Sequence, residues 1–346
     1  MYKKVKFKGG SQMKKILVVG SLLLIGMFAG CSKEKEVVAE GKVKTQVLKV
    51  AFNQSENHPQ YKALAKFSDQ LEEQTKGAYK LEISPNALLG DQRATAELVQ
   101  NGVIQMSVVG NPVVESFNKD FSVIGLPYLY DNLEHQKKVF LSDILDPLFK
   151  SVSSSGFEVI GAFTAGARCL YTDKPMMKPE DLKGYKFRVM QSDTMKKMVD
   201  YMGGIGTPMG QGEVYTAVQQ GVIEGGENNE VTYVDLKHYE IAPYFSYTNH
   251  LMVPDLIIIN EKLYTGMTSE NRKIFDDLMK QTIENEFEVW NDNVEAAKKV
   301  AIENGAKFID VDIKPFQDRV KPLQEEVANS SELTKKIYTQ VRELAK

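Results

Sequence analysis

Two arginines stand out because they lie in segments that otherwise have the pattern of β-strands. Arg168 lies in "GARCLYT" and Arg188 lies in "KFRVM", each among apolar residues. A guanidinium is a planar fork that binds a carboxylate through two parallel hydrogen bonds. A single strand arginine can be purely structural, but two at the same ends of neighbouring strands would grip a carboxylate. Ligands of open α/β sheets bind beyond the carboxyl ends of the strands, so we predict an organic-anion site there.

A polar stretch, "GGENNEVTY" (225–233), follows an amphipathic segment and falls at the same predicted edge. Glycine and asparagine favour turns, but adjacent amides can also hydrogen-bond a polar ligand. We assign Gly225 and Gly226 to a tight turn, Asn228 to the carboxylate of the ligand, and Asn229 to stabilising the turn.

Sequence motifs of common enzymes are missing. The chain has no GxSxG elbow, no GxGxxG after a strand, no P-loop and no HExxH. Its histidines have no metal-ligand spacing: His58, His135, His238 and His250. We therefore predict no metal and no cofactor. An enzyme acting on carbohydrate acids remains an alternative, because glycosidases use two carboxylates and Glu224 and Glu227 lie close in sequence.

Length and charge narrow the class of protein further. The chain has 346 residues, enough for about two domains. Hydrophobic residues make up 42% and charged residues 26%, as in ordinary globular proteins. The formal net charge of −3 provides no basic field for nucleic acid, so nucleic-acid binding is not expected.

The N-terminal segment has the pattern of an export signal. In "MKKILVVGSLLLIGMFAGC" (13–31), lysines precede an apolar run that ends in small residues. The segment resembles a bacterial lipoprotein signal, which predicts a signal peptide over 1–30, lipidation of Cys31 and a flexible tether over 31–45. Phe28 departs from the usual leucine, and Met13 is a better start than Met1. Plain cleaved secretion and an uncleaved anchor helix are the alternatives.

Hydrophobic periodicity predicts two α/β units after the tether. Strands are expected at 47–53, 79–84 and 104–110, with helices between them, which favours a sheet of parallel neighbours. A second unit has strands at 157–166 and 168–173, a strand ending near Met190, and a helix capped by Ser192. A strand-like segment at 250–260 precedes a helix over about 269–304 and further helices from about Pro315.

Three long stretches together resemble one family. "GARCLYTDKPMMKPEDLKGYKFRVM", "GTPMGQGEVYTAVQQGVIEGGENN" and "TNHLMVPDLIIIN" are similar to the DctP-type substrate-binding subunits of TRAP (tripartite ATP-independent periplasmic) transporters. The resemblance covers nearly all of residues 45 to 340. It implies an α/β fold of two domains, type II-like among periplasmic binding proteins. A hinge, an interdomain cleft and a long helix that spans both domains belong to this fold. Domain I would be 46–165 plus 254–293, and domain II would be 166–253 plus 294–346.

The resemblance also implies a function. The receptor would close on a small organic anion and deliver it to the TRAP permease subunits in a membrane, without ATP. It would work outside the cytoplasm, held to the membrane by lipidated Cys31, as a monomer. In this family an arginine of the "K-x-R-V" strand clamps the carboxylate, a second arginine assists, and an asparagine completes the site. The residues expected at the ligand are Arg188, Arg168, Asn228, Asn53, Asn111, Gln211, Arg93, His58, Met190 and Tyr215.

The polar character of this predicted pocket favours a sugar acid. Gln211 stands where the sialic-acid branch has an aromatic residue, and Gly110 and Asn111 stand where that branch has an acid. A C4-dicarboxylate would leave many of these groups unpaired, and an unpaired buried polar group costs roughly 1–3 kcal/mol. The sequence is similar to the branch that binds glucuronate and galacturonate. Sialic acid, diketogulonate, another sugar acid or a C4-dicarboxylate are the alternative ligands, and a receptor that does not serve a permease is a further alternative.

Overall fold

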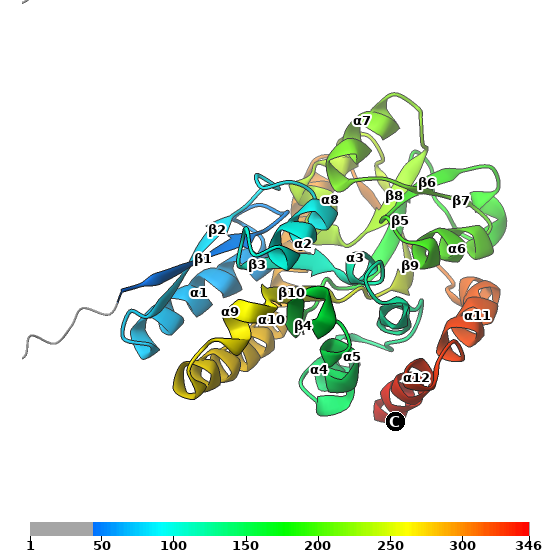
Figure 1. Ribbon diagram of the computed structural model, residues 1–346. Coiled ribbons are helices and arrows are strands. Elements are labelled where there is room, and N and C mark those ends of the chain that lie inside the picture. Colours follow the sequence, from blue (N-terminus) through cyan, green and yellow to red (C-terminus); the bar gives the residue numbers. More distant parts are fainter. Residues whose placement is uncertain (1–43, 346) are drawn as a thin grey trace, which may run out of the picture. The chain divides into compact units, whose positions relative to one another are not determined.

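The computed structural model describes residues 44–345, so the predicted signal, Cys31 and most of the tether lie outside the described residues. Two separate β-sheets form the framework of this part of the chain (Figure 1). Among the described helices, none combines the length and apolar character that a membrane crossing requires.

The first sheet has the strand order β2-β1-β3-β10-β4. Its strands are β1 (Gln46–Ala51), β2 (Tyr79–Ser84), β3 (Met106–Gly110), β4 (Phe157–Phe163) and β10 (Asp255–Asn260). β2, β1 and β3 run parallel, as the strand–helix–strand order predicts. β10 runs antiparallel to both β3 and β4, so a late segment of the chain completes the first sheet. We call this sheet and its helices the first lobe.

Helices of the first lobe pack on or beside the first sheet. They are α1 (Pro59–Gln74), α2 (Gln92–Gln100), α3 (Asn111–Val114), α4 (Leu133–Phe140), α5 (Asp146–Lys150) and α9 (Glu261–Thr265). In α1, the predicted apolar positions Leu64, Phe67 and Leu71 are fully buried. Burying each such side chain stabilises the fold by roughly 1.5–3 kcal/mol. His58 caps the start of α1.

The second sheet has the strand order β11-β9-β5-β8-β6-β7, and with its helices it forms the second lobe. Its strands are β5 (Arg168–Thr172), β6 (Lys186–Val189), β7 (Ile205–Pro208), β8 (Gly225–Asn228), β9 (Tyr244–Leu251) and β11 (Lys307–Asp310). Its helices are α6 (Asp193–Met202), α7 (Val214–Gln219), α8 (Glu230–Asp235) and α11 (Lys314–Ala328). Short 3-10 helices occur in both lobes: η1 (Lys119–Gly125), η2 (Asp143–Leu145), η3 (Ser153–Ser155), η4 (Pro179–Leu182), η5 (Gln211–Glu213) and η6 (His238–Glu240).

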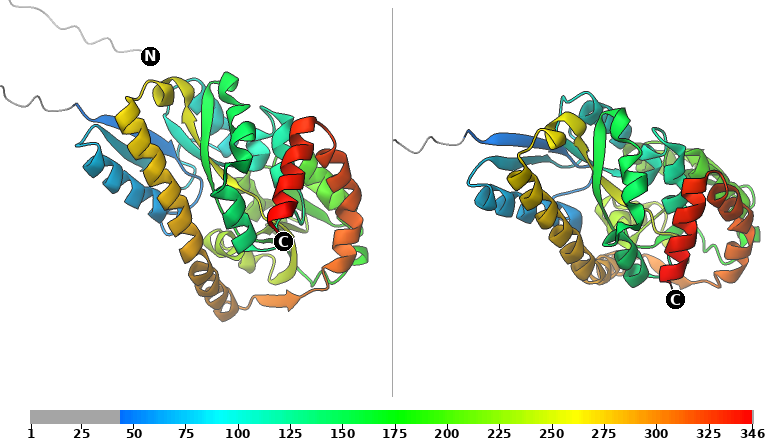
Figure 2. Two further views of the ribbon diagram at one scale, coloured as in Figure 1. Left: turned by 90° about the horizontal axis from the view of Figure 1, so that it is seen from below. Right: turned by 60° about the horizontal axis from the view of Figure 1, so that its bottom comes forward.

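The chain passes between the two sheets three times. Residues 164–167 join β4 to β5, residues 252–254 join β9 to β10, and α10 (Ser269–Glu303) leads from the first lobe to β11. α10 packs on α1, where the rings of Phe67 and Phe275 are 5.0 Å apart, and further along on α8. Figure 2 shows this helix running past α1 toward β11. The predicted two-domain α/β architecture with a helix spanning both domains is confirmed.

Two predicted elements have other forms in the structure. The segment 250–260 is not one strand, because it divides at Met252–Pro254 into β9 and β10 of different sheets. Pro254 has no N–H and cannot continue a strand ladder. "GGEN" is not a turn but the buried strand β8. The adjacent Asn229 caps α8 by accepting a hydrogen bond from the backbone N–H of Thr232.

The C-terminal helix, α12 (Glu332–Leu344), differs from the predicted domain boundary. Residues 294–346 were expected in domain II, but α12 packs on η1 and α4 of the first lobe. The His135 ring lies 2.8 Å from the carbonyl oxygen of Val341, and Arg342 pairs with Asp131 at 2.6 Å. These contacts place the end of the chain against the first lobe, while α11 packs on α6 of the second.

We predict that Gly166→Ala in the first crossing destabilises the protein strongly. Gly166 has φ +61°, and an added Cβ would lie 2.5 Å from Nε1 of buried Trp290. Backbone strain and overpacking together should lower the free energy of unfolding by about 2–4 kcal/mol. Gly184→Ala is the matched control, since Gly184 has φ +82° but no atom within 4 Å of the added Cβ. Urea denaturation measures both variants, and equal losses would show that Trp290 imposes no constraint.

Candidate functional site

Three strands of the second sheet bring the predicted anion-binding residues to one edge. β8 lies between β5 and β6, antiparallel to β5 and parallel to β6. The start of β5 therefore lies near the ends of β8 and β6. Arg168 is the first residue of β5, Asn228 the last of β8 and Arg188 the next to last of β6, and all three side chains are buried. The structure thus brings together three residues that are far apart in the sequence.

Arg168 is fully engaged with the neighbouring strand. Its Nε and Nη2 donate to the carboxylate of Glu227 at 2.5 and 2.8 Å, in a bidentate pair. Nη1 donates to Oδ1 of Asn228 at 2.8 Å, and Nη2 also donates to the Glu227 carbonyl at 2.7 Å. Burial by itself raises the pKa of Glu227, but the charge and hydrogen bonds of Arg168 prevail and lower it to about 2. The positive charge of Arg168 is therefore matched inside the protein.

Arg188 has no such partner. Its Nε donates to the Met209 carbonyl at 3.1 Å, and among residues 44–345 no carboxylate lies within ion-pair distance of it. Burial lowers its pKa, although an arginine side chain remains protonated in proteins. A buried cation without a counter-charge is unfavourable. The Arg188 guanidinium is therefore the group of this site that an incoming anion would stabilise most.

A cavity of about 280 Å³ lies beside Arg188, between the two lobes. This volume is near the lower end of the range for small-molecule sites. The first lobe contributes polar groups to its wall from Asn53, Gln54, Ser55, Asn86, Gln92 and Arg93. The second lobe contributes Arg188, Met190, Gln191, Gln211 and Asp235. Asp91 and apolar groups of Val113, Met209 and Leu236 also line the cavity, so its one buried cation, Arg188, lies among mixed polar and apolar groups.

Hydrogen bonds join the lobes across this cavity. Gln211 accepts from Nδ2 of Asn53 at 3.0 Å and donates to Oε1 of Gln54 at 3.1 Å. Ser55 donates to the carboxylate of Asp235 at 2.8 Å. These contacts exist only while the lobes are close together. The described conformation is therefore closed around the cavity.

A further cross-lobe contact lies outside the wall of this cavity. Glu115, which follows α3 in the first lobe, accepts hydrogen bonds from Ser192 at 2.7 Å and Thr194 at 2.6 Å. Both hydroxyls are at the N-terminus of α6, where a negative charge is favourable. Burial raises the pKa of Glu115 and the two hydroxyls oppose that rise. This contact holds the two lobes together without touching the wall of the cavity.

The predicted ligand residues fall into two groups in the structure. Arg188, Asn53, Gln211, Arg93 and Met190 line the cavity. Arg168 and Asn228 do not line it, but lie at the adjoining strand edge in the network of Glu227. The Oδ1 of Asn228 is occupied by Arg168 and the backbone N–H of Asn229, which leaves its Nδ2 to donate.

Three predicted residues lie elsewhere, each held by another part of the fold. His58 packs between Phe52 and Trp290, and burial lowers its pKa to about 3. Asn111 is buried and donates to the Phe121 carbonyl at 2.9 Å. Tyr215 donates to Glu240 at 2.8 Å, away from the cavity.

Sequence reasoning missed other members of the site. Gln54 and Ser55 line the cavity and directly follow the predicted Asn53, so their position after a strand end was an available signal. Asp235 lies at the end of α8, and the sequence around it gave no comparable signal. Glu227 was considered only as an enzymatic acid, whereas it is the partner of Arg168.

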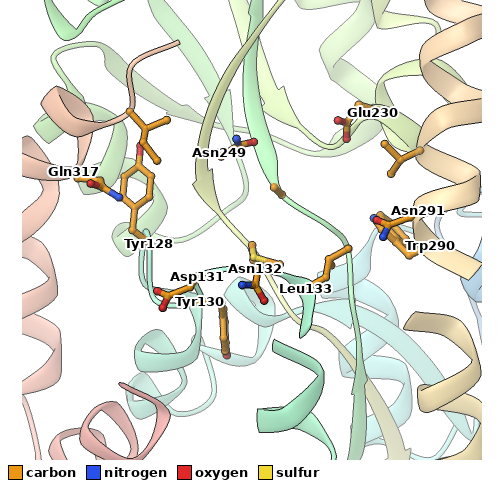
Figure 3. A pocket seen from close by; sticks show the side chains of 14 residues that line it. Tyr128, Tyr130, Asp131, Asn132, Leu133, Glu230, Asn249, Trp290, Asn291 and Gln317 are labelled. Atoms are coloured by element: carbon orange, nitrogen blue, oxygen red, sulfur yellow. The ribbon is translucent and has the colours of Figure 1, made fainter. Parts of the chain in front are cut away.

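A second cavity, larger at about 520 Å³, lies at the crossings between the lobes. We call it the hinge cavity. Figure 3 shows Trp290 and Asn291 of α10 on one side of it and Tyr128 and Gln317 on the other. Ala167 and Met252 of the two strand crossings also line it. No lysine, arginine or histidine is among its lining residues, all of them in the described range. It therefore lacks the cation that an organic anion needs.

Comparisons with known proteins agree on one family. Residues 50–331 match the family described as bacterial extracellular solute-binding protein, family 7 (DctP). A TRAP periplasmic solute-binding protein of Anaerococcus prevotii, solved with bound glucuronate, is 40% identical with a TM-score of 0.84, covering 87% of this chain and 98% of its own. The corresponding protein of Xanthobacter autotrophicus, solved with galacturonate, is 29% identical with a TM-score of 0.82, covering 86% and 99%. An uncharacterized protein of Salmonella typhimurium, YiiZ, is 33% identical over 83% of this chain and 88% of its own.

We predict that the Arg168–Glu227 pair makes stability depend on pH. The pKa of Glu227 is lowered from 4.5 to about 2 in the folded state. Its stabilising effect should therefore be complete above pH 4.5 and should fade as the pH falls toward 2. Urea denaturation at pH 7 and at pH 3 should show a smaller loss on acidification in Glu227→Gln than in the wild type. Glu72→Gln removes an exposed pair with Lys80 and should behave as the wild type does.

In Arg168→Met the free energy of unfolding should change with pH in the opposite direction to that of the wild type. The variant leaves the Glu227 carboxylate buried beside only the neutral ring of His250, whose Nε2 is 3.6 Å from Oε2, which should lower the free energy of unfolding at pH 7 by about 3–5 kcal/mol. Burial then raises the pKa of Glu227, so the variant should become more stable as the pH falls from 7 and the carboxyl is protonated. An unchanged wild-type slope in this variant would contradict the role given to the pair.

Proposed function

We propose that this chain, which belongs to the bacterial extracellular solute-binding protein family 7 (DctP), captures a hexuronate such as glucuronate or galacturonate. Members of this family are TRAP solute-binding proteins that bind small organic anions outside the cytoplasm and work with membrane permease subunits. The observation that carries the ligand proposal is the buried Arg188, without an acid partner among residues 44–345, beside a small cavity whose lining includes several amides.

The carboxylate of the sugar acid would bind Arg188. A charge-assisted pair with a guanidinium is among the strongest hydrogen-bonded contacts in proteins. In this orientation the sugar ring extends into the cavity toward Asn53 and Gln211. Arg168 and Asn228 would complete the carboxylate-binding site from the adjoining strand edge, where the Nδ2 of Asn228 would donate a hydrogen bond to the ligand. A ligand with a carboxylate at one end of the molecule suits a site with one buried cation that has no acid partner.

The hydroxyl groups of a sugar suit the rest of the wall. Asn53, Gln54, Gln211 and Asp235 offer both donors and acceptors, whereas a short dicarboxylate carries only acceptors. Relatives with 40% and 29% identity were solved with glucuronate and galacturonate, which supports the same ligand class here. Other sugar acids, diketogulonate, sialic acid and C4-dicarboxylates are the alternatives to be tested beside the uronates.

Capture would proceed by closure of the two lobes. The ligand would bind groups of both lobes at once, which favours the closed conformation over an open one. Only the closed state would be stabilised by the hydrogen bonds of Gln211 to Asn53 and Gln54 and by the contact of Glu115 with α6. Closure would then present one defined shape to the permease, and release there would require that these contacts break.

The proposal also includes the domain boundaries and a lipid anchor at the membrane. Domain I would comprise 46–165 plus 254–293 and also α12, and domain II would comprise 166–253 with 294–328. Lipidation of Cys31 would hold the receptor at the membrane surface as a monomer, with residues 31–45 as the tether. Cys31 lies outside the described residues, so this part of the proposal depends on the sequence pattern alone.

The alternative of a carbohydrate-acid enzyme has less support. A glycosidase needs one carboxyl group that carries a proton and another that is free to act. Glu227 is bound by Arg168 with its pKa lowered to about 2, and Glu224 accepts the backbone N–H of Lys186 at 2.6 Å. Neither carboxylate lines the cavity.

Calorimetry should show binding of glucuronate or galacturonate by the wild type, and a loss of at least about 100-fold in affinity in Arg188→Gln. That loss corresponds to roughly 3 kcal/mol, within the range for removing one partner of a buried charge pair. Arg319→Gln is the control, because Arg319 is an exposed arginine paired with Glu180. Succinate, sialic acid and glucose test the alternative ligands and the need for a carboxylate. Absence of uronate binding by the wild type would refute the ligand, and equal binding by Arg188→Gln would refute the clamp.

A further inference from the structure

One row of residues across the second sheet contains the clamp arginine and a buried tyrosine. Gly226 of β8 is paired in register with Tyr171 of β5 on one side and with Arg188 of β6 on the other. Side chains of residues that are paired in register point to the same face of a sheet. Tyr171 and Arg188 therefore extend over the same face, with only the backbone of a glycine between them.

Gly226 is required because the tyrosine ring lies over it. A Cβ added to Gly226 would lie 2.5 Å from the hydroxyl oxygen of Tyr171 and 2.8 Å from its ring. Without that side chain the Tyr171 ring crosses β8 in the direction of β6. The role of this glycine is thus a close approach rather than the turn predicted from the sequence.

The hydroxyl of Tyr171 is a buried polar group without a partner. Tyr171 is fully buried, and its hydroxyl forms no hydrogen bond with any residue in the range 44–345. Burial raises its pKa, and the positive charge of Arg188 opposes that rise. A buried hydroxyl without a partner is unfavourable, so its retention here calls for an explanation.

A second unpartnered group lies beside it. The ring of His238 is 5.3 Å from the Tyr171 ring, is 2% exposed, and has no partner for Nδ1 among the described residues. Burial, followed by the charge of Arg188, lowers the pKa of His238 to about 4. The imidazole is therefore neutral at neutral pH, so both groups are uncharged hydrogen-bonding groups in the field of the same guanidinium.

We propose that Tyr171 and His238 are positioning residues for the Arg188 guanidinium in ligand binding, a role that rests on the proposed function. Neither group hydrogen-bonds Arg188 directly, so they would orient the guanidinium through a bridging water. Arg168 shows the other arrangement, in which Glu227 holds an arginine and also neutralises it. Uncharged partners hold Arg188 in place and leave its full charge for the carboxylate of the ligand.

Tyr171→Phe separates this role from a structural one. Because the hydroxyl has no protein partner, its loss should leave the denaturation midpoint unchanged or raise it. The affinity for the uronate that the wild type binds should nevertheless fall about 5- to 20-fold. Tyr233→Phe is the matched control, since its buried ring lies 5.3 Å from that of Tyr171 and its hydroxyl donates to the Ala242 carbonyl at 2.7 Å. That variant should lose stability and keep its affinity.

Two variants of His238 test the requirement for an uncharged partner. His238→Gln keeps a neutral polar group and should bind the uronate within about threefold of the wild type. His238→Glu places a carboxylate beside Arg188 and should weaken binding at least tenfold at pH 7, without a matching loss of stability. Wild-type affinity in both Tyr171→Phe and His238→Glu would overturn the positioning role. If the wild type itself binds neither glucuronate nor galacturonate, the proposed function fails instead, so the two failures are distinguishable.

Discussion

The buried ion pair between Arg168 and Glu227 is the constraint on which the anion site depends. It joins the start of β5 to the end of β8, and through Asn228 it fixes the last residue of that strand. Neither charge can be removed alone without leaving the other buried and uncompensated. The pair therefore fixes the edge of the second sheet before any ligand arrives, and Arg188 on the neighbouring strand β6 is placed by the same edge.

Two arginines at one edge thus have different electrostatic roles. Arg168 is neutralised within the protein and serves as a structural brace. Arg188 is equally buried but has no acid partner among the described residues, so under the proposed function a bound anion would balance its charge. The polar wall facing it comes from both lobes, which makes the position of the lobes and the occupancy of the cavity interdependent. An anion bound at Arg188 under the proposed function would therefore both neutralise this charge and bridge the two lobes.

The sequence predicted the parts of this arrangement that depend on local pattern. Period-two runs located Arg168 and Arg188 in strands, helical spacing located α1 and α10, and the family motifs related them to Asn228. Contacts between segments that are separated in the chain could not be predicted from local sequence pattern. The ring of His58 is covered by Trp290, the amide of Asn111 is taken by the Phe121 carbonyl, and Tyr215 is paired with Glu240. Each of these three looked available because its partner is 10 to 232 residues away in the chain. Likewise, nothing local in "GGENN" reveals that a tyrosine of another strand crosses over Gly226.

The hinge cavity gives the molecule an optical property. Trp290 is the single tryptophan of the chain, and it lies in the wall of that cavity, against Gly166 of the first crossing and the ring of His58. Opening of the lobes, as proposed, would rearrange the crossings and with them the surroundings of this one indole. The unmodified receptor therefore carries a fluorophore at its hinge, and its emission would report such opening without any introduced label.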